Sequence, residues 1–269
     1  MTDVDPITTH LTHLAQSRYS ASTLRERERV LRSLPFDVAT ADRQQTRAWW
    51  QARQQLNDGT PRAATSLSQE ASHVRSFYRW AMQEGIVERN AGDWLPRVRR
   101  AQRKPTPVQE PDLYRLMLDA PDRLHRMIAL AAMAGLRSAE IGHVRWEDID
   151  RGNGVLWVRS GKGGKDRSVP LSSGLLAELG DPDTGPIVGR TMTGKAVSLA
   201  VARYMRGRGV DSTAHKLRAR YLTRFLAATG DLAAAAEVAG HSDLTSIGRY
   251  VVASSDTMRR GAEAAGRIG

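Results

Sequence analysis

The chain has 269 residues, with 40 lysines and arginines against 29 acidic residues, so its formal net charge is +11 and its isoelectric point is near 10.6. All but five of the basic residues are arginines. Because a planar guanidinium binds phosphate with two donors, this excess of arginine indicates a phosphate-bearing partner. A GC-rich coding sequence would also explain the excess. The absence of cysteine excludes disulfide scaffolds, zinc fingers and thiol catalysis, and the polar N-terminus and lack of an apolar run of about 20 residues argue against secreted and membrane-spanning classes.

The first 96 residues predict a compact helical bundle. Helical spacing of apolar residues begins at Ile7, Ser20 or Ser22 is expected to cap a second helix, and Thr40 a third. The apolar positions of these three helices are Ile7, Leu11, Leu14, Leu24, Val30, Leu31, Leu34, Trp49 and Trp50.

A further helix in this region has the clearest pattern. Apolar residues recur at spacings of three and four, which makes one stripe on a helix, and the other side carries Arg75 and Arg79. The stripe consists of Leu67, Ala71, Val74, Tyr78 and Ala81. No cluster of titratable groups in this half suggests chemistry, so it is interpreted as a binding module.

Residues 97–107 form a basic segment with two prolines and no acidic residue. We interpret it as an extended linker between a helical domain, residues 1–96, and a second domain, residues 108–269. An ordinary solvated connector would explain the prolines but not the density of positive charge, so the segment is expected to contact a phosphate backbone. The expected contacts, together with Arg75 and Arg79, are Arg97, Arg99, Arg100, Arg103 and Lys104.

The second domain is predicted to be mainly helical with a small antiparallel sheet. Val155–Val158 and Arg167–Leu171 are expected to be strands joined by the glycine-rich turn 161–165, and residues 146–150 to add a third strand. The expected helices contain Leu113–Met117, Met127–Ala134, Ser138–Val144, Gly194–Arg206, His215–Ala228 and Leu232–Ala239.

Four short segments of this domain carry residues suited to phosphate chemistry. They are the glycine turn ending at Arg137, the Gly161–Lys165 turn with Lys162 at its tip, the His215-x-x-Arg218 pair, and the segment from His241 to Tyr250. Each by itself has a plain structural explanation: a surface arginine, a hairpin, a pair on one helix face, or a half-buried aromatic.

Together and in this order, these residues resemble the signature of the tyrosine recombinase, or phage integrase, family, which is Arg, Lys, His-x-x-Arg, His or Trp, and Tyr. The segments GLRSAEI, GKGGKDRSVPL and GHSDLTSIGRY are also similar to the family's, and the likeness covers roughly residues 108–254. The first half resembles, more loosely, the SAM-like helical core-binding domain of the same family. The matching site residues are Arg137, Lys162, His215, Arg218, His241 and Tyr250.

The resemblance implies an enzyme that cuts and rejoins duplex DNA through a 3′-phosphotyrosine, without metal, ATP or another cofactor. Tyr250 would be the nucleophile, and Arg137 and Arg218 would clamp the phosphate oxygens. Lys162, favoured over Lys165, would protonate the leaving 5′ oxygen. The two histidines would hydrogen-bond the phosphate or exchange a proton with the tyrosine, and Glu140 would support the site.

Several classes remain open at this point. A bacteriophage or mobile-element integrase is expected, working on attachment sites in the bacterial cytoplasm, on the nucleoid, as a homotetramer with an excision or DNA-bending factor. A Xer-like resolvase, a type IB topoisomerase and a non-catalytic DNA-binding regulator of the same fold are the alternatives. His10 and His13 could share a metal, but no third ligand is suggested near them, so no metal site is expected.

Two expectations concern the ends of the chain. Because the helical pattern starts almost at once, no separate N-terminal domain for arm-type DNA sites is expected. Residues 256–269 are expected to form either a helix that docks on a neighbouring protomer or a frayed tail.

Overall fold

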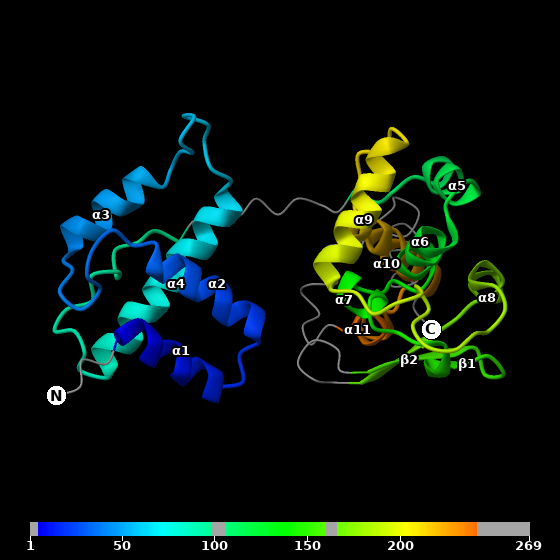
Figure 1. Ribbon diagram of the computed structural model, residues 1–269, viewed down its shortest axis with the longest axis horizontal. Helices are drawn as coiled ribbons and strands as arrows, with labels where there is room; N and C mark the ends of the chain where they lie inside the picture. The colour runs from blue at the N-terminus through cyan, green and yellow to red at the C-terminus, as the bar shows by residue number, and fades with distance from the viewer. Residues whose placement is uncertain (1–4, 98–105, 160–165, 241–269) are drawn as a thin grey trace, which may run out of the picture. The chain divides into compact units, whose positions relative to one another are not determined.

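The computed structural model describes residues 5–97, 106–159 and 166–240 (Figure 1). The chain divides into two compact units, Met1–Gln102 and Arg103–Gly269, and the division falls within the segment interpreted as a linker. Helices dominate the described residues and the strands form one antiparallel sheet, which confirms the predicted fold class. Within the described ranges, every helix is too short or too polar to span a bilayer.

The first unit is a helical bundle. In it α1, α2 and α4 pack on one another, and α3 adds Trp49 and Trp50 to the same core. The predicted stripe of α4 is buried along its whole length. The helices are α1 (Pro6–Gln16), α2 (Ala21–Arg32), α3 (Arg43–Ala52) and α4 (Ala64–Gln83).

Two details of this unit differ from the prediction. Asp42, not Thr40, caps α3: its carboxylate accepts the Gln45 backbone N–H at 2.7 Å, and the Gln45 side chain accepts the Asp42 N–H at 2.9 Å, so two end groups of the helix are satisfied at once. Ser20 caps α2, which ends at Arg32; Leu34 therefore lies beyond the helix, although it is buried.

The second unit contains the remaining elements. Helix α8 was not predicted, because seven residues are too few for a clear period, although Ser172 caps it by accepting the Leu175 N–H at 3.2 Å. The elements are α5 (Glu110–Leu118), α6 (Asp122–Met133), α7 (Ser138–Ile141), the 3₁₀ turn η1 (Trp146–Asp148), β1 (Ile149–Asp150), β2 (Val155–Val158), β3 (Arg167–Pro170), α8 (Ser173–Leu179), α9 (Gly194–Gly207), α10 (Ala214–Thr229) and α11 (Leu232–Ala239).

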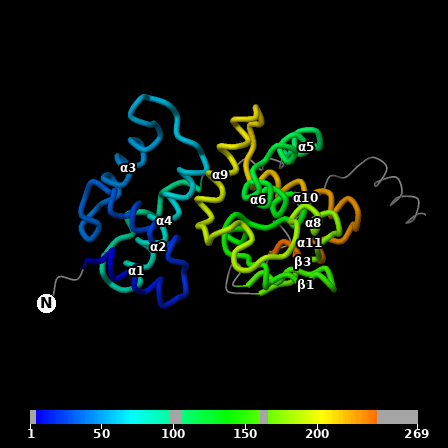
Figure 2. Tube along the Cα trace, turned by 45° about the vertical axis from the view of Figure 1, so that its right-hand side comes forward, coloured from blue at the N-terminus to red at the C-terminus, as the bar shows by residue number. Residues whose placement is uncertain are grey.

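Helix α6 forms the centre of this unit. Its residues from Met127 to Ala132 are fully buried, and α5, α7, α8, α9 and α10 all pack against it. Helix α11 lies against both α10 and β3, as Figure 2 shows. Helix α11 therefore connects the sheet, through β3, with helix α10.

The sheet has the order β1-β2-β3, with antiparallel neighbours. Leu156, Val158 and Val169 are buried on one side of it. Arg167 pairs with Val158 across the strands, so the alternation of side chains places this arginine on the buried side as well. A charge in that position needs partners.

Candidate active site

The C-terminus of α11 is capped by arginines. Because the last carbonyls of a helix have no partner within it, they must be satisfied from elsewhere. Three consecutive carbonyls are satisfied by three guanidinium groups: Val238 accepts from Arg167 at 2.9 Å, Ala239 from Arg218 at 2.8 Å, and Gly240 from Arg137 at 2.7 Å. The negative end of the helix dipole favours this gathering of positive charge.

Arg137 is held at the start of α7. Gly135 makes the turn before it with φ +64°, and a Cβ there would lie 2.3 Å from the Tyr221 ring, so both backbone and space require glycine. The Arg137 backbone N–H donates to Glu140 Oε2 at 2.7 Å, and its Nη1 donates to Oε1 at 2.8 Å. Its side chain is 23% exposed, so it remains open to solvent on one side.

Glu140 joins two of the three arginines. Besides Arg137, it accepts two hydrogen bonds from Arg167, at 2.7 and 2.9 Å, and both side chains are less than a tenth exposed. Burial disfavours the charged carboxylate, but the hydrogen bonds from Arg167 and from the Arg137 backbone outweigh it and lower the pKa of Glu140 to about 2. Glu140 is therefore ionised at neutral pH.

Arg218 and His215 lie in the first two turns of α10. Arg218 is only 3% exposed, and its Nη1 donates to the Gly135 carbonyl while its Nη2 donates to Ala239. These bonds connect the turn before Arg137 to the end of α11. His215 is exposed, in the first turn of the same helix.

The resulting charge is positive. Three guanidinium groups gather here, and among the described hydrogen bonds one ionised carboxylate, that of Glu140, pairs with Arg137 and Arg167, so the group places positive charge on fixed donors. Such an arrangement suits an anion whose charge increases during reaction, as in phosphoryl transfer. Sequence reasoning missed Arg167; the signal was the strand period, which places it on the same side as Val169.

The remaining predicted residues of the second half fall outside the described residues. These are Lys162, His241 and Tyr250, and in the linker Arg99, Arg100, Arg103 and Lys104. In sequence, His241 follows directly on Gly240, and Lys162 lies between β2 and β3. The chain thus leads from the arginine-capped end of α11 straight into the segment that contains Tyr250.

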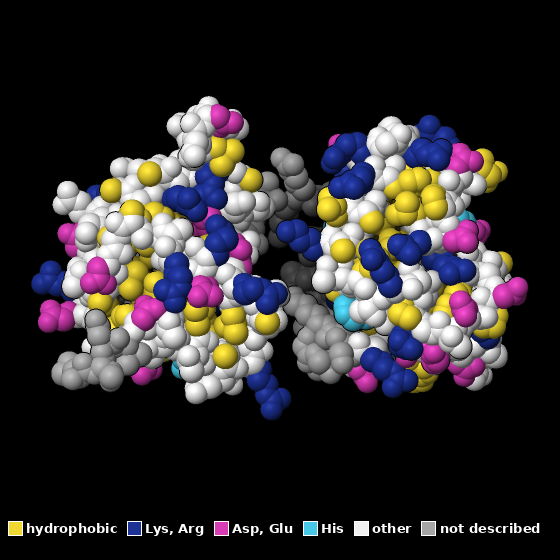
Figure 3. Space-filling model, in the orientation of Figure 1, with side chains coloured by type: hydrophobic (Ala, Val, Ile, Leu, Met, Phe, Trp, Pro, Cys, Tyr) yellow, Lys and Arg dark blue, Asp and Glu magenta, His cyan; other side chains and the backbone are white. Residues whose placement is uncertain are grey.

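Three predicted DNA contacts of the first unit lie close together. Arg79 and Arg97 are exposed, and Arg75 donates to the carbonyls of Leu95 and Pro96 at 2.9 and 2.7 Å. Burial, and then the positive charges of Arg97 and Arg79, lower the pKa of Arg75. Mutual repulsion of this kind is relieved by a bound polyanion. Figure 3 shows arginine and lysine side chains on the visible face of both units.

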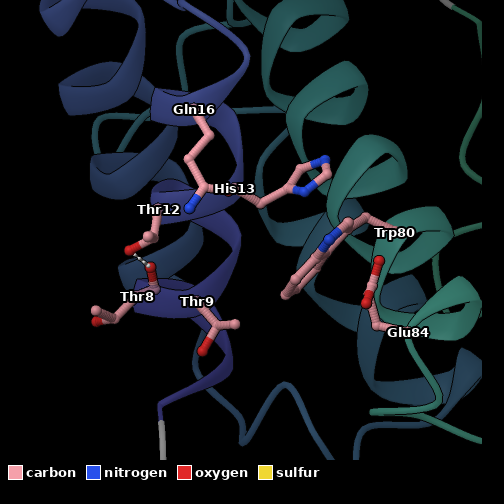
Figure 4. Close-up of a pocket in the computed structure, with 7 residues that line it drawn as sticks. All are labelled: Thr8, Thr9, Thr12, His13, Gln16, Trp80 and Glu84. Carbon is pink, nitrogen blue, oxygen red and sulfur yellow. Dashed lines mark hydrogen bonds between the residues drawn. The ribbon is translucent and has the colours of Figure 1, made fainter.

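The first unit also has an open groove of about 360 Å³ between α1 and α4, lined by Thr8, Thr9, Thr12, His13, Gln16, Trp80 and Glu84 (Figure 4). None of the candidate catalytic residues lines it. Among the described residues, no three histidine, aspartate or glutamate side chains gather in a way that could hold a metal ion.

Comparison with known proteins identifies a family and several relatives of this chain. Residues 106–181 match the phage integrase family. The tyrosine recombinase XerC of Yersinia pestis is 30% identical over 70% of this chain and 68% of that protein. XerC of Xanthomonas campestris pv. campestris is 29% identical over 92% of this chain and 83% of that protein.

Two solved structures share the fold. A lambda integrase fragment, crystallised as a dimer bound to a COC′ core site, has a TM-score of 0.72 at 18% identity, over 91% of this chain and 93% of that one. The Tn1549 transposon integrase, in complex with a circular intermediate DNA, has a TM-score of 0.73 at 16% identity, over 97% of this chain and 98% of that one.

Proposed function

Because the chain belongs to the tyrosine recombinase family and is a site-specific recombinase, we propose that it cuts and rejoins duplex DNA through a 3′-phosphotyrosine on Tyr250. The observation that carries this proposal is the meeting of Arg137 and Arg218, which are far apart in sequence, on neighbouring carbonyls at the end of α11. In sequence, Tyr250 follows Gly240, the residue that ends this helix, by ten positions.

The two arginines would bind the non-bridging oxygens of the scissile phosphate. Arg137 is held by Glu140 and the Gly240 carbonyl, and Arg218 by the Gly135 and Ala239 carbonyls, so the guanidinium planes are fixed before DNA arrives and little reorganisation is needed when charge develops on the phosphate. This preorganisation is what a tyrosine needs, because its hydroxyl, with an ordinary pKa of about 10, is a weak nucleophile at neutral pH.

In the cleavage step, the Tyr250 oxygen forms a bond to phosphorus and the bond from phosphorus to the 5′ oxygen breaks. Lys162 would give its proton to that 5′ oxygen, and His215 or His241 would accept the tyrosine proton. Religation runs the same steps in reverse, so the bond energy is conserved in the phosphotyrosine, and we expect neither a metal nor ATP to be required.

Duplex DNA is the proposed partner of both units. Arg75, Arg79 and Arg97 of the first unit and the basic segment 97–107 would contact the backbone phosphates, which position a protein on DNA without reading sequence. The active assembly is proposed to be a homotetramer on two DNA sites, assisted by an accessory DNA-bending or excision factor.

Two biological roles fit this chemistry. We propose a phage or mobile-element integrase, which joins two different attachment sites. The sequence similarity to XerC proteins favours a second candidate, a resolvase that recombines two identical sites. Two plasmids distinguish the roles: one carries two unlike sites from the DNA that flanks the gene, and the other carries two identical repeats. An integrase should recombine the unlike sites, whereas a resolvase should recombine the identical repeats.

The test of the chemistry uses a nicked half-site from which the cut fragment diffuses away. The wild-type chain should form a denaturant-resistant protein–DNA adduct, and Tyr250→Phe should bind the half-site unchanged and form none, because its ring lacks the attacking oxygen. Adduct in the variant would mean that another residue attacks. Binding without adduct in the wild type would favour the non-catalytic regulator.

A further inference from the structure

Arg167 is the one arginine at the end of α11 that the proposed chemistry does not use. It lies on β3, on the buried side of the sheet, and its side chain is 8% exposed. A buried guanidinium is costly unless it is paired and fully hydrogen-bonded. The described contacts satisfy it with three bonds, two to the Glu140 carboxylate and one to the Val238 carbonyl.

These bonds join three elements that approach the site from different directions. Glu140 is on α7 and also holds Arg137 through both its backbone and its side chain. Val238 is in the last turn of α11, two residues before Gly240, whose carbonyl accepts from Arg137. In sequence, Arg167 follows the segment that contains Lys162. Among the bonds just described, Arg167 is the residue that contacts both α7 and α11 from the sheet.

We propose that Arg167 is a positioning residue for DNA cleavage, which sets Arg137 and the end of α11 in register by bridging Glu140 and Val238. The inference rests on the proposed function but adds a residue to it. Arg167 does not touch the scissile phosphate; it orients Arg137, through Glu140, and fixes the point from which the chain runs to His241 and Tyr250.

A planar guanidinium is required for this bridge. Its fork donates twice to one carboxylate while its Nε donates in another direction, to Val238. A lysine keeps the charge but has a single ammonium, which cannot keep all three bonds in the same geometry. Arg167→Lys therefore tests the geometry apart from the charge.

The experiment measures single-turnover adduct formation on the nicked half-site, half-site affinity and thermal stability for each variant. Arg167→Lys should slow adduct formation by roughly 10- to 100-fold, the usual loss when a residue that orients a functional side chain is replaced. Its affinity for the half-site should stay within about threefold of wild type. Arg145→Lys is the matched control, because it makes the same substitution at an arginine that is half-exposed and pairs with Glu147 at 3.3 Å; it should cleave like wild type. Cleavage by Arg167→Lys at the wild-type rate would overturn the proposal.

A second pair of variants leaves Arg167 intact. A Cβ on Gly240 would lie 3.1 Å from Arg137 Nη1 and from Arg167 Cδ, whereas one on Gly230 would meet nothing within 4 Å, and both glycines end a helix with positive φ. Gly240→Ala should therefore form adduct roughly 10-fold more slowly than Gly230→Ala. The two variants should lose similar thermal stability, because each places a Cβ on a residue with positive φ. Equal cleavage by the two would contradict the proposed register.

Coupling separates positioning from a general structural role. Because Arg167 acts partly through Glu140 and partly through Val238, the double variant Arg167→Lys/Glu140→Gln should lose clearly less cleavage than the product of the two single losses. Losses that multiply would show that Arg167 does not act through Glu140 and would overturn the proposal. Absence of adduct with the wild-type chain would instead reject the proposed function itself.

Discussion

Among the residues that the structure describes, two glutamates are buried among arginines, one in each unit. Glu140 lies between Arg137 and Arg167, and Glu70 between Arg53 and Arg62. In both, burial opposes ionisation but the arginines prevail and lower the pKa to about 2. A carboxylate among arginines is therefore not by itself a catalytic feature; what distinguishes Glu140 is that its arginines also hold the end of α11.

This pair of residues gives a matched test. Glu140→Gln and Glu70→Gln should each destabilise the chain by roughly 3 kcal/mol, because each removes the counter-charge of guanidinium groups that are largely withdrawn from solvent, such as Arg167 at 8% and Arg62 at 15% exposure. Only Glu140→Gln should also slow adduct formation, measured on the nicked half-site. Because the folded carboxyls have a pKa below the ordinary 4.5, their contribution is fully present above pH 4.5 and is lost as the pH falls towards 2. Slow cleavage by Glu70→Gln would show that the effect on cleavage is not specific to Glu140.

At the scale of elements, the packing of the helices in the first unit buries two histidines, His10 of α1 and His73 of α4. His10 is 1% exposed, with its ring 4.7 Å from that of Trp80 and 5.5 Å from that of Phe77, and His73 is buried on the same helix as these aromatics. No described residue hydrogen-bonds the ring nitrogens of either histidine. Burial, and then the charge of Arg27, lower the pKa of both to about 4.

The first unit should therefore lose stability in mild acid. The unfolded chain takes up protons near pH 6.5 and the folded histidines only near pH 4, so stability is complete above pH 6.5 and falls as the pH drops towards 4, by about 3 kcal/mol for each histidine. Thermal unfolding of the double variant His10→Leu/His73→Leu should depend much less on pH across this window. His143→Gln, at an exposed position of the second unit, is the control. An unchanged pH dependence in the double variant would assign the acid sensitivity to other groups.

At the scale of the whole molecule, the surplus of positive charge is the property that a DNA partner would use. The net charge is +11, and the Arg75, Arg79 and Arg97 cluster has no carboxylate among the groups that perturb Arg75. Arg43, in contrast, is exposed but donates two hydrogen bonds to Asp93, at 2.8 and 3.0 Å. Exposed arginines such as Arg79 and Arg97 should therefore contribute more to binding than Arg43, whose charge is paired with Asp93.

The salt dependence of binding measures this difference. Half-site affinity should fall steeply with salt, and Arg79→Gln and Arg97→Gln should each reduce the slope of log K against log salt by about 0.9, since each removes one neutralised phosphate. Arg43→Gln should change the slope less, because its charge is already compensated. The measurement is a titration of labelled half-site at several salt concentrations. A flat response in the wild type would reject DNA binding through phosphate contacts.

The sequence by itself determined the fold class, most of the helices and the strands β2 and β3, because the spacing of apolar residues and the capping signals are local. The expected third strand over residues 146–150 was only partly right, since 146–148 form a 3₁₀ turn and only Ile149–Asp150 pairs with β2, and the helix expected to reach Val144 ends at Ile141. It also named Arg137, His215 and Arg218 through their motifs. Where local signals compete, it failed: Asp42 displaced Thr40 as a cap, since only Asp42 forms the reciprocal bonds with Gln45.

The tertiary structure alone decided which groups meet at the end of α11. Arg137 reaches Gly240 across 103 positions of sequence and Arg167 reaches Val238 across 71. The strand period places Arg167 on the buried side of the sheet, but no local pattern states what it meets there, because its partners lie on two other elements, Glu140 on α7 and Val238 on α11. Residue types and periods follow from each stretch of chain, whereas the pairing of buried charges depends on elements that only folding brings together.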